Sequence, residues 1–320
     1  MTILITGGAG FIGSHLARKY LEKKYQVIVI DNFSTGNRKN IEDLITDSNF
    51  TLIEGSIFDY NLTLDLVSKA DVIFHLAAAV GVKLIVSEPS QTIKNNLIGA
   101  QNIFKASKKF NKRIIFASTS EVYGKSKNFP FNESSDLIIG ASNLSRWSYA
   151  CAKLMDEFLA YAYFQESNLP VTIVRLFNTV GPCQTGQYGM VIPTFVEQAL
   201  SNLDITVFGD GNQSRCFCSV HDVISALTKI ESSDNTFGEI INIGTNEEIS
   251  INELSELVIK LANSNSKIKK IPYDIAYKPG FEDMERRIPD ISKAKRLLNW
   301  IPSQNLESIL NSVIHFYKDK

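Results

Sequence analysis

Tyr149 and Lys153 are a pair of residues in this 320-residue chain whose types and spacing suggest chemistry. They stand four positions apart in segment 146–163, which has a helical pattern, so both side chains would lie on one face, one turn apart. A lysine ammonium beside a tyrosine favours the phenolate, which can take a proton from a hydroxyl group. Because this spacing is common in proteins, the pair alone predicts no particular function.

Thr119, Ser120 and Glu121 form a second polar group, which follows the apolar run 113–118. That run predicts a buried strand, and the carboxyl ends of such strands face the ligand crevice of a parallel sheet. Glu121 would then present a carboxylate to a ligand. The alternative is that Glu121 is an exposed carboxylate in a turn.

The segment 7–13 predicts a turn that holds a dinucleotide. Its glycines follow an apolar strand and open a helix, where the backbone must approach a pyrophosphate and helix amides face the phosphates. Asp31 ends the next apolar run and can accept hydrogen bonds from ribose hydroxyls while repelling a 2′-phosphate, which favours NAD over NADP. The alternative is a structural glycine turn and a loop aspartate. The residues assigned to this turn are Gly7, Gly10, Phe11, Ile12 and Gly13.

Other strand ends add to the predicted cofactor site. The stretch 75–78, HLAA, closes the fourth predicted strand with small residues that would let a cofactor lie close to the backbone, and we expect His75 itself to be a packed strand residue. Tyr149 and Lys153 are also expected to contact the cofactor. The remaining residues that we assign to this site are Asn32, Ile57, Leu76, Ala77, Ala78 and Asn96.

The elements that must position these residues alternate along the chain. Short apolar runs separated by amphipathic segments predict a doubly wound α/β fold, with a parallel sheet flanked by helices. We expect a Rossmann domain over 1–178 and a smaller C-terminal α/β domain over 179–320, with a strand near 239–245 rejoining the first sheet. The predicted strands of the first domain are 2–6, 26–31, 51–55, 71–77, 113–118 and 171–177.

Composition excludes several classes of protein. Lys plus Arg is 33 and Asp plus Glu is 34, so the net charge of −1 offers no attraction to nucleic acid. We expect a cytoplasmic protein that is not bound to a membrane, because neither a signal-peptide pattern nor an apolar run of spanning length is present. The four cysteines have no paired spacing, so we expect reduced thiols and no metal site.

Together these motifs resemble the extended short-chain dehydrogenase/reductase superfamily, specifically its NAD-dependent nucleotide-sugar epimerases, dehydratases and decarboxylases. The resemblance extends from GGAGFIGSHL at 7–16 through RLFNTVGP at 175–182 to ERRIPDISKAKRLLNW at 285–300. It implies that Tyr149 takes the proton of the sugar C4 hydroxyl while NAD accepts the C4 hydride, with Thr119 relaying the proton or orienting the hydroxyl. A 4-keto sugar would result.

Within this group the chain is most similar to the UDP-glucuronate decarboxylases, whose pattern Thr-Ser-Glu-Val-Tyr-Gly is found at 119–124. A C4 ketone makes the C6 carboxylate a β-keto acid, so carbon dioxide can leave, and C5 then needs a proton from Glu121 or Ser120. The resemblance assigns Arg146 and Arg287 to the substrate carboxylate, which a guanidinium fork suits. Considered alone, each arginine could equally be a solvated or salt-bridged surface residue.

The resemblance also assigns residues to the UDP-sugar. Asn178 and Arg215 match positions that contact the diphosphate, although Arg215 could instead pair with Asp210 or Asp222. The loop 79–83 departs from the decarboxylase pattern, and its Lys83 could meet a carboxylate or a diphosphate, or lie on the surface. Ser56 replaces a usual aspartate near the adenine, where Ile57 backbone or Asp59 could substitute.

Three alternatives to a decarboxylase remain. A UDP-sugar 4-epimerase would use the same tyrosine, lysine and threonine but has no evident need for Glu121. A 4,6-dehydratase for dTDP-glucose usually has Asp where this chain has Ser120, whereas the GDP-mannose kind shares Thr-Ser-Glu. The third is a non-catalytic NAD-sensing scaffold. The resemblance further implies a homodimer, to which Leu154, Phe158, Leu159 and Tyr163 could contribute unless they serve the monomer core.

Overall fold

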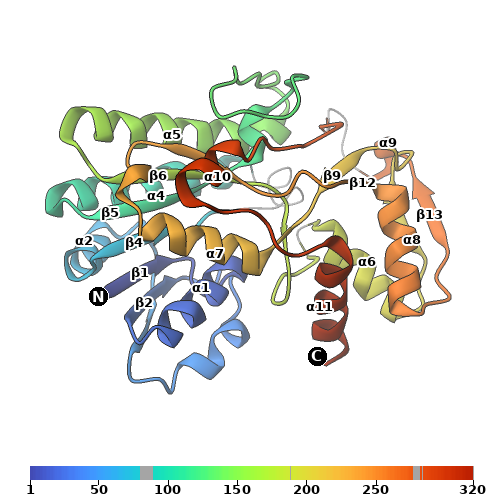
Figure 1. Ribbon diagram of the computed structural model, residues 1–320, viewed down its shortest axis with the longest axis horizontal. Helices are drawn as coiled ribbons and strands as arrows, with labels where there is room; N and C mark the ends of the chain where they lie inside the picture. The colour runs from blue at the N-terminus through green and yellow to red at the C-terminus, as the bar shows by residue number, and fades with distance from the viewer. Residues whose placement is uncertain (80–88, 188, 277–281, 283, 320) are drawn as a thin grey trace.

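A parallel sheet of seven strands forms the centre of the protein. The computed structural model describes residues 1–79, 89–187, 189–276, 282 and 284–319 (Figure 1). The strand order is β11-β6-β5-β4-β1-β2-β3, which confirms the predicted doubly wound fold. The strands are β1 (Thr2–Thr6), β2 (Gln26–Asp31), β3 (Phe50–Glu54), β4 (Val72–His75), β5 (Arg113–Thr119), β6 (Val171–Leu176) and β11 (Ile240–Ile243).

The central strands are buried on both faces, as their unbroken apolar sequences predict. All four residues of β4 are buried, as are five of the six residues of β6. The six strands predicted in the first part of the chain are confirmed to within three residues at each end. The last strand, β11, returns from the C-terminal part of the chain and pairs with β6, Ile240 opposite Ile173. Thr119, the catalytic candidate that ends β5, is therefore positioned by the central part of the sheet.

Two layers of helices cover the sheet (Figure 1). One face packs against α1 (Phe11–Glu22), α7 (Val220–Glu231) and α10 (Ser292–Leu298). The opposite face packs against α2 (Tyr60–Lys69), α4 (Pro89–Phe110) and α5 (Ser148–Ser167). Since α7, β11 and α10 come from the second half of the chain, both halves build the sheet layer.

A smaller group of helices packs beside the sheet, at the right of Figure 1. Here α6 (Val191–Leu200), α8 (Ile251–Ala262) and α11 (Leu306–Lys318) share an apolar core with β8 (Ile205–Phe208). Ser250 and Glu253 form the capping box that starts α8, and Leu254 and Val258 on that helix are buried. The other elements are β7 (Thr179–Val180), β9 (Ser214–Cys216), β10 (Cys218–Ser219), β12 (Glu248–Ser250), β13 (Ile268–Ile271), α9 (Tyr273–Ala276) and the 3₁₀ helices η1 (Arg38–Asn40), η2 (Glu42–Leu44), η3 (Ser120–Tyr123), η4 (Ser145–Trp147) and η5 (Asp234–Thr236). Within the described ranges, no helix combines the length and apolar character needed to cross a membrane.

Candidate active site

A cavity of about 1230 Å³ lies at the carboxyl ends of the central strands and extends to the helices of the C-terminal part. Its volume exceeds the range of about 300–1,000 Å³ that is typical for one small ligand. Strand ends and the turns that follow them supply one part of the wall, and residues from β8, β9 and α11 supply another. The cavity can therefore hold a dinucleotide and a second ligand together.

The glycine turn after β1 lines one end of this cavity. Gly7 has φ +71°, and a Cβ atom there would meet the Ala77 Cα at 2.8 Å, so only glycine fits between the two strand ends. A Cβ on Gly13 would collide with the Gly7 carbonyl. Because glycine has no Cβ, α1 can begin directly over the turn. All the residues assigned to this turn, Gly7, Gly10, Phe11, Ile12 and Gly13, line the cavity. The turn has the close backbone approach that a pyrophosphate requires.

Asp31 stands beside the glycine turn at the end of β2. Its Oδ2 accepts a hydrogen bond from the Ala9 amide at 2.9 Å and its Oδ1 accepts one from the Phe33 amide at 2.8 Å. Burial raises the pKa of Asp31, while these two backbone hydrogen bonds oppose the change. Each carboxylate oxygen has a second lone pair, and the residue lines the cavity, so the side chain can still accept ribose hydroxyls.

Most of the other predicted cofactor residues also line the cavity, namely Asn32, Ile57, Leu76, Ala77 and Ala78. Asn96 is buried instead, and its Oδ1 accepts the Ala79 amide at 3.1 Å, whereas its neighbour Asn95 lines the cavity. A helix turns by about 100° per residue, so adjacent asparagines point in different directions, and the contact of Asn96 with the cofactor stays a prediction.

Two further sequence expectations near the cofactor end concern His75 and Asp59. His75 is buried and its Nδ1 lies 2.7 Å from the Thr6 Oγ1, and burial lowers the pKa of His75 to about 3, which is the packed neutral residue that was expected. Asp59 caps α2 by accepting the Asn61 and Leu62 amides. Of the two groups considered as substitutes for an aspartate at Ser56, Ile57 lines the cavity and Asp59 serves the helix.

Tyr149 reaches the cavity from the first turn of α5, and Thr119 and Ser120 reach it from the end of β5. Burial raises the pKa of Tyr149, and the Glu121 carboxylate raises it further, while a hydrogen bond with the Thr119 side chain lowers it. The phenol is therefore neutral in this state. Formation of the phenolate requires additional positive charge near the ring.

Lys153 lies one turn further along α5 and is buried. Its Nζ stands over the Phe116 ring, 3.8 Å from the ring centroid, and 3.9 Å from the Asp156 Oδ2. Burial lowers the pKa of Lys153, while Asp156 and Glu157 raise it. The lysine is not among the described residues that line the cavity.

Glu121 is held by two arginines. Arg146 binds it with both guanidinium NH₂ groups, with 3.0 Å between Nη2 and Oε1, and Arg287 Nη1 lies 3.3 Å from Oε1. Burial alone would raise the pKa of Glu121, but the two guanidiniums outweigh it and lower the pKa to about 2. Arg287 lines the cavity, whereas Arg146 is 1% exposed and lies behind Glu121. Neither arginine is the solvated surface residue that was the alternative.

The predicted diphosphate residues lie further along the cavity wall. Asn178 donates from Nδ2 to the Cys216 carbonyl at 3.0 Å, and Arg215 donates from Nη1 to the Ser214 carbonyl at 2.7 Å. Both line the cavity. The carboxylates considered as partners of Arg215 have other hydrogen-bond donors, since Asp210 accepts from Asn212 and Asp222 from Ser303 and Gln304. Lys83 lies outside the described residues.

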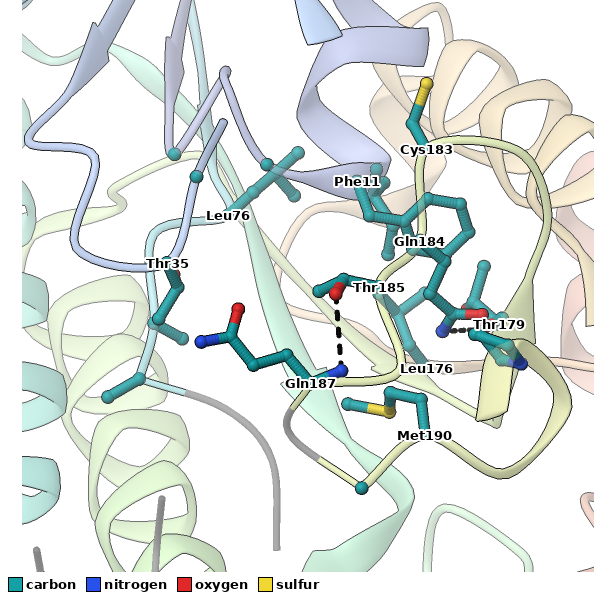
Figure 2. Close-up of a pocket in the computed structure, with 18 of the residues that line it drawn as sticks. Phe11, Thr35, Leu76, Leu176, Thr179, Cys183, Gln184, Thr185, Gln187 and Met190 are labelled. Atoms are coloured by element: carbon teal, nitrogen blue, oxygen red, sulfur yellow. Dashed lines mark hydrogen bonds between the residues drawn. The ribbon is translucent and has the colours of Figure 1, made fainter. Parts of the chain in front are cut away.

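Sequence reasoning missed the loop after β7, which forms much of the wall shown in Figure 2. Gln184 Nε2 donates to the Thr179 carbonyl at 3.0 Å, and the Gln187 amide donates to the Thr185 Oγ1 at 3.2 Å. The Gln187 side chain extends across the cavity toward Thr35 (Figure 2). The signal was the turn-rich sequence that follows a parallel strand, since such a turn opens on the ligand crevice.

The model of the GDP-mannose 4,6 dehydratase family matches residues 4–313. The chain belongs to this family. It is 43% identical to a UDP-N-acetyl-alpha-D-glucosaminuronate decarboxylase of Bacillus cytotoxicus over 99% of this chain and 97% of that protein. It is 36% identical to UDP-glucuronic acid decarboxylase 1 of Danio rerio over 98% of this chain and 72% of that protein.

Solved structures of related epimerases and dehydratases have the same fold. A UDP-glucuronic acid 4-epimerase from Bacillus cereus, in complex with UDP-glucuronic acid and NAD, superposes with a TM-score of 0.90 at 31% identity, covering 100% of this chain and 99% of that one. The dTDP-glucose 4,6-dehydratase DesIV from Streptomyces venezuelae, with NAD bound, has a TM-score of 0.90 at 28% identity, with coverage of 100% and 97%. The predicted resemblance is confirmed, and the protein is an enzyme of the short-chain dehydrogenase/reductase type.

Proposed function

We propose that the protein is an NAD-dependent decarboxylase that oxidises UDP-glucuronate at C4 and then releases the C6 carboxylate, giving UDP-xylose or its 4-keto form. The observation that carries this proposal is Glu121 between Arg146 and Arg287, two residues beyond Thr119 on the cavity wall. Oxidation at C4 needs a base near C4 only. A carboxylate and a cavity-facing guanidinium beside that base are explained by chemistry at C5 and C6.

NAD would occupy the end of the cavity lined by the glycine turn, and residues 1–178 would supply most of its contacts. When bound, it supplies the acceptor for the C4 hydride. Asp31 would bind the adenosine ribose and reject a 2′-phosphate, which supports NAD over NADP. The UDP-sugar would lie mainly against residues 179–320, with Asn178 and Arg215 at its diphosphate.

Tyr149 would take the proton of the C4 hydroxyl, with Thr119 orienting that hydroxyl. Because burial and Glu121 raise the pKa of Tyr149, the phenolate needs the Lys153 ammonium and the positive charge of the bound cofactor. Thr119 is suited to the orienting role, since it hydrogen-bonds the phenol and also caps η3 by accepting the Glu121 amide at 3.2 Å. One threonine thereby couples the positions of the base and the carboxylate.

Arg287 would bind the substrate carboxylate. It lines the cavity and lies 3.3 Å from Glu121, so an entering carboxylate competes with Glu121 for the same guanidinium. Loss of one cationic partner would raise the pKa of Glu121 from its low value of about 2 and allow it to carry the proton for C5. Ser120, whose side chain also lines the cavity, is the second candidate donor. Arg146 would keep Glu121 in place throughout.

The experiment is proton NMR of the purified protein with NAD⁺ and, in parallel, UDP-glucuronate, UDP-N-acetylglucosaminuronate, UDP-glucose and UDP-galactose. Loss of C6 from a uronate supports the proposal, and the faster of the two uronates identifies the substituent accepted at C2. Inversion at C4 with all carbons retained would instead make the protein a 4-epimerase, and loss of the C6 hydroxyl from a hexose a 4,6-dehydratase. Binding of NAD without any turnover would favour a sensing scaffold.

The protein would act as a homodimer through α4 and α5. On α5 the side chains of Met155, Phe158 and Tyr161 are exposed, 65% in the case of Phe158. Of the residues named from the sequence, Leu159 and Tyr163 pack against the core of the sheet layer. Leu154 packs against a second cluster beneath η3. Light scattering of the parent protein and of Phe158→Asp tests the interface, with a dimer expected for the first and a monomer for the second. A cytoplasmic location stays a prediction from the sequence.

A further inference from the structure

Asp156 is a buried carboxylate to which the proposed reaction gives no role. It lies on α5, three residues after Lys153, and is 1% exposed. Neither of its oxygens has a hydrogen-bond partner among the described residues. A buried carboxylate without hydrogen bonds is costly and calls for an explanation, because other polar groups in protein interiors are nearly always paired.

The neighbouring charged groups are already paired, with one exception. Glu157 binds Arg175 at 2.7 Å and also accepts the Ser118 hydroxyl, and Arg146 is bound to Glu121. His75 on β4 is neutral and hydrogen-bonded to Thr6. The cation that remains beside Asp156 is the Lys153 ammonium, with 3.9 Å between Nζ and Oδ2.

Lys153 has few other groups that favour its charge. The Phe116 ring contacts the ammonium from β5, with 3.8 Å from Nζ to the ring centroid, and an aromatic face stabilises a cation only modestly. Burial opposes the charged form, and Asp156 is the carboxylate that opposes burial most strongly. The ring and the carboxylate together hold the ammonium by charge, and neither accepts from it a hydrogen bond that a ligand would have to break.

We propose that Asp156 is the positioning residue of Lys153, which keeps this lysine charged and in place behind Tyr149. The inference rests on the role proposed above for Tyr149 and Lys153 in C4 oxidation. The carboxylate acts through the lysine rather than on the tyrosine, because its own negative charge raises the pKa of Tyr149 and alone would hinder formation of the phenolate. The benefit of Asp156 therefore depends on the ammonium that it retains.

The first test is the pH dependence of kcat/KM for product formation from the substrate identified by NMR, for the parent and for Asp156→Asn. Without the carboxylate, burial makes Lys153 lose its proton at lower pH, so the alkaline fall in kcat/KM should move down by about one pH unit. Glu166→Gln is the matched control, since it removes an exposed carboxylate from the same helix and should leave the profile unchanged. A profile for Asp156→Asn within about 0.3 units of the parent would overturn the proposal.

The second test needs no activity and is a double-mutant cycle with Lys153→Met, followed by urea unfolding at neutral pH. Asp156→Asn should lower the urea midpoint of the parent, because it leaves a buried cation without its carboxylate. In the Lys153→Met background the same change should have little effect on the midpoint, because burial raises the pKa of Asp156 to about 7 and, without the lysine that lowers it, the carboxyl group is protonated. Equal shifts in both backgrounds would contradict the inference. If the parent turned over no sugar, the proposed function would fail while this cycle would still decide the role of Asp156.

Discussion

The two ends of the cavity are formed by different kinds of groups. The cofactor end consists of backbone and small side chains at the ends of regular strands, with Gly7 packed against Ala77 and Asp31 hydrogen-bonded to the Ala9 amide. The sugar end consists of charged side chains on two 3₁₀ helices and an irregular segment, with Glu121 between Arg146 and Arg287. The first end is shaped by backbone geometry and the second by a balance of charges.

The two ends therefore differ in how each would bind its ligand. Backbone at the cofactor end is fixed by the sheet, so the site for a pyrophosphate exists before the ligand arrives. At the sugar end, Glu121 occupies the guanidinium that we assign to the substrate carboxylate. Under this assignment, substrate binding would exchange one ion pair for another, and the sugar end would respond to the charge of its ligand. The predictions below test this contrast, beginning with the largest expected effect.

Tyr149→Phe tests the proposed base of C4 oxidation, which lies between the two ends. Removal of the phenol oxygen should reduce C4 oxidation by about 10³-fold, since proton transfer by a positioned side chain contributes on that order. Product formation followed by proton NMR measures the rate, and calorimetry should show that the variant still binds NAD. Tyr161→Phe makes the same change at an exposed position on α5 and should retain full activity. A Tyr149→Phe enzyme with more than a tenth of the parent rate would show that another group is the base.

Glu121→Gln tests the charge balance of the sugar end through acid stability. The pKa of Glu121 is lowered from its ordinary value near 4.5 to about 2, so its ionisation stabilises the fold above the unfolded pKa, and this contribution is lost as pH falls toward 2. The contribution is on the order of 3 kcal/mol. The variant should be less stable than the parent at pH 6, and the gap in free energy of unfolding should narrow as pH falls, measured by urea unfolding. If the free energies of unfolding of the two proteins changed in parallel with pH, the ion pairs of Glu121 with the two arginines would not stabilise the fold.

Arg215→Leu tests whether the two ends bind different ligands, because it should weaken binding of the UDP-sugar and leave binding of NAD nearly unchanged. Loss of a charge-assisted contact to a diphosphate should raise KM for the UDP-sugar by about 10- to 100-fold, while the dissociation constant of NAD changes by less than about twofold. Steady-state kinetics and calorimetry provide the two values. Arg296→Gln, at an exposed position on α10, is the control. An equal loss of affinity for NAD would mean that Arg215 supports the whole cavity rather than one end.

Asp31→Asn tests the cofactor end and should have the smallest effect. The amide keeps the shape of the side chain but cannot accept both the Ala9 and the Phe33 amides, which costs about 1 kcal/mol or roughly a fivefold loss of NAD affinity. Removal of the negative charge should also narrow the preference for NAD over NADP. Titration of both dinucleotides by calorimetry measures the ratio. If NADP bound no better relative to NAD, a feature other than the Asp31 charge would select the cofactor.

Sequence patterns predicted the fold, and most residues that they assigned to the cofactor line the cavity, because both depend on local regularities. Apolar runs of strand length and the glycine spacing at 7–13 report backbone geometry directly, and the spacing of Tyr149 and Lys153 reports one helix face. Asn96 stays a prediction at this end, because its Oδ1 accepts the Ala79 amide while its neighbour Asn95 lines the cavity. Helical phase within a segment is not determined by composition, so a choice between adjacent asparagines needs the structure.

The sugar end was less accessible to sequence reasoning, because its contacts join distant segments. The residues Glu121, Arg146 and Arg287 were identified one by one, but their mutual ion pairs depend on how η3, η4 and the segment near Arg287 meet. The same applies to Asp156, whose significance depends on the absence of hydrogen bonds to it in the described structure. Charge balance is a property of three-dimensional packing and leaves no periodic signal in the chain.

The central claim is that C6 leaves as carbon dioxide, and the direct measurement uses UDP-glucuronate and UDP-N-acetylglucosaminuronate that carry an isotopic label at C6. Mass spectrometry would follow the label in the gas phase and in the nucleotide sugar, for the parent protein and for Tyr149→Phe as the inactive reference. We predict labelled carbon dioxide from at least one uronate with the parent only, and a product shorter by one carbon. Complete retention of the label in a product whose C4 configuration has inverted would contradict the account.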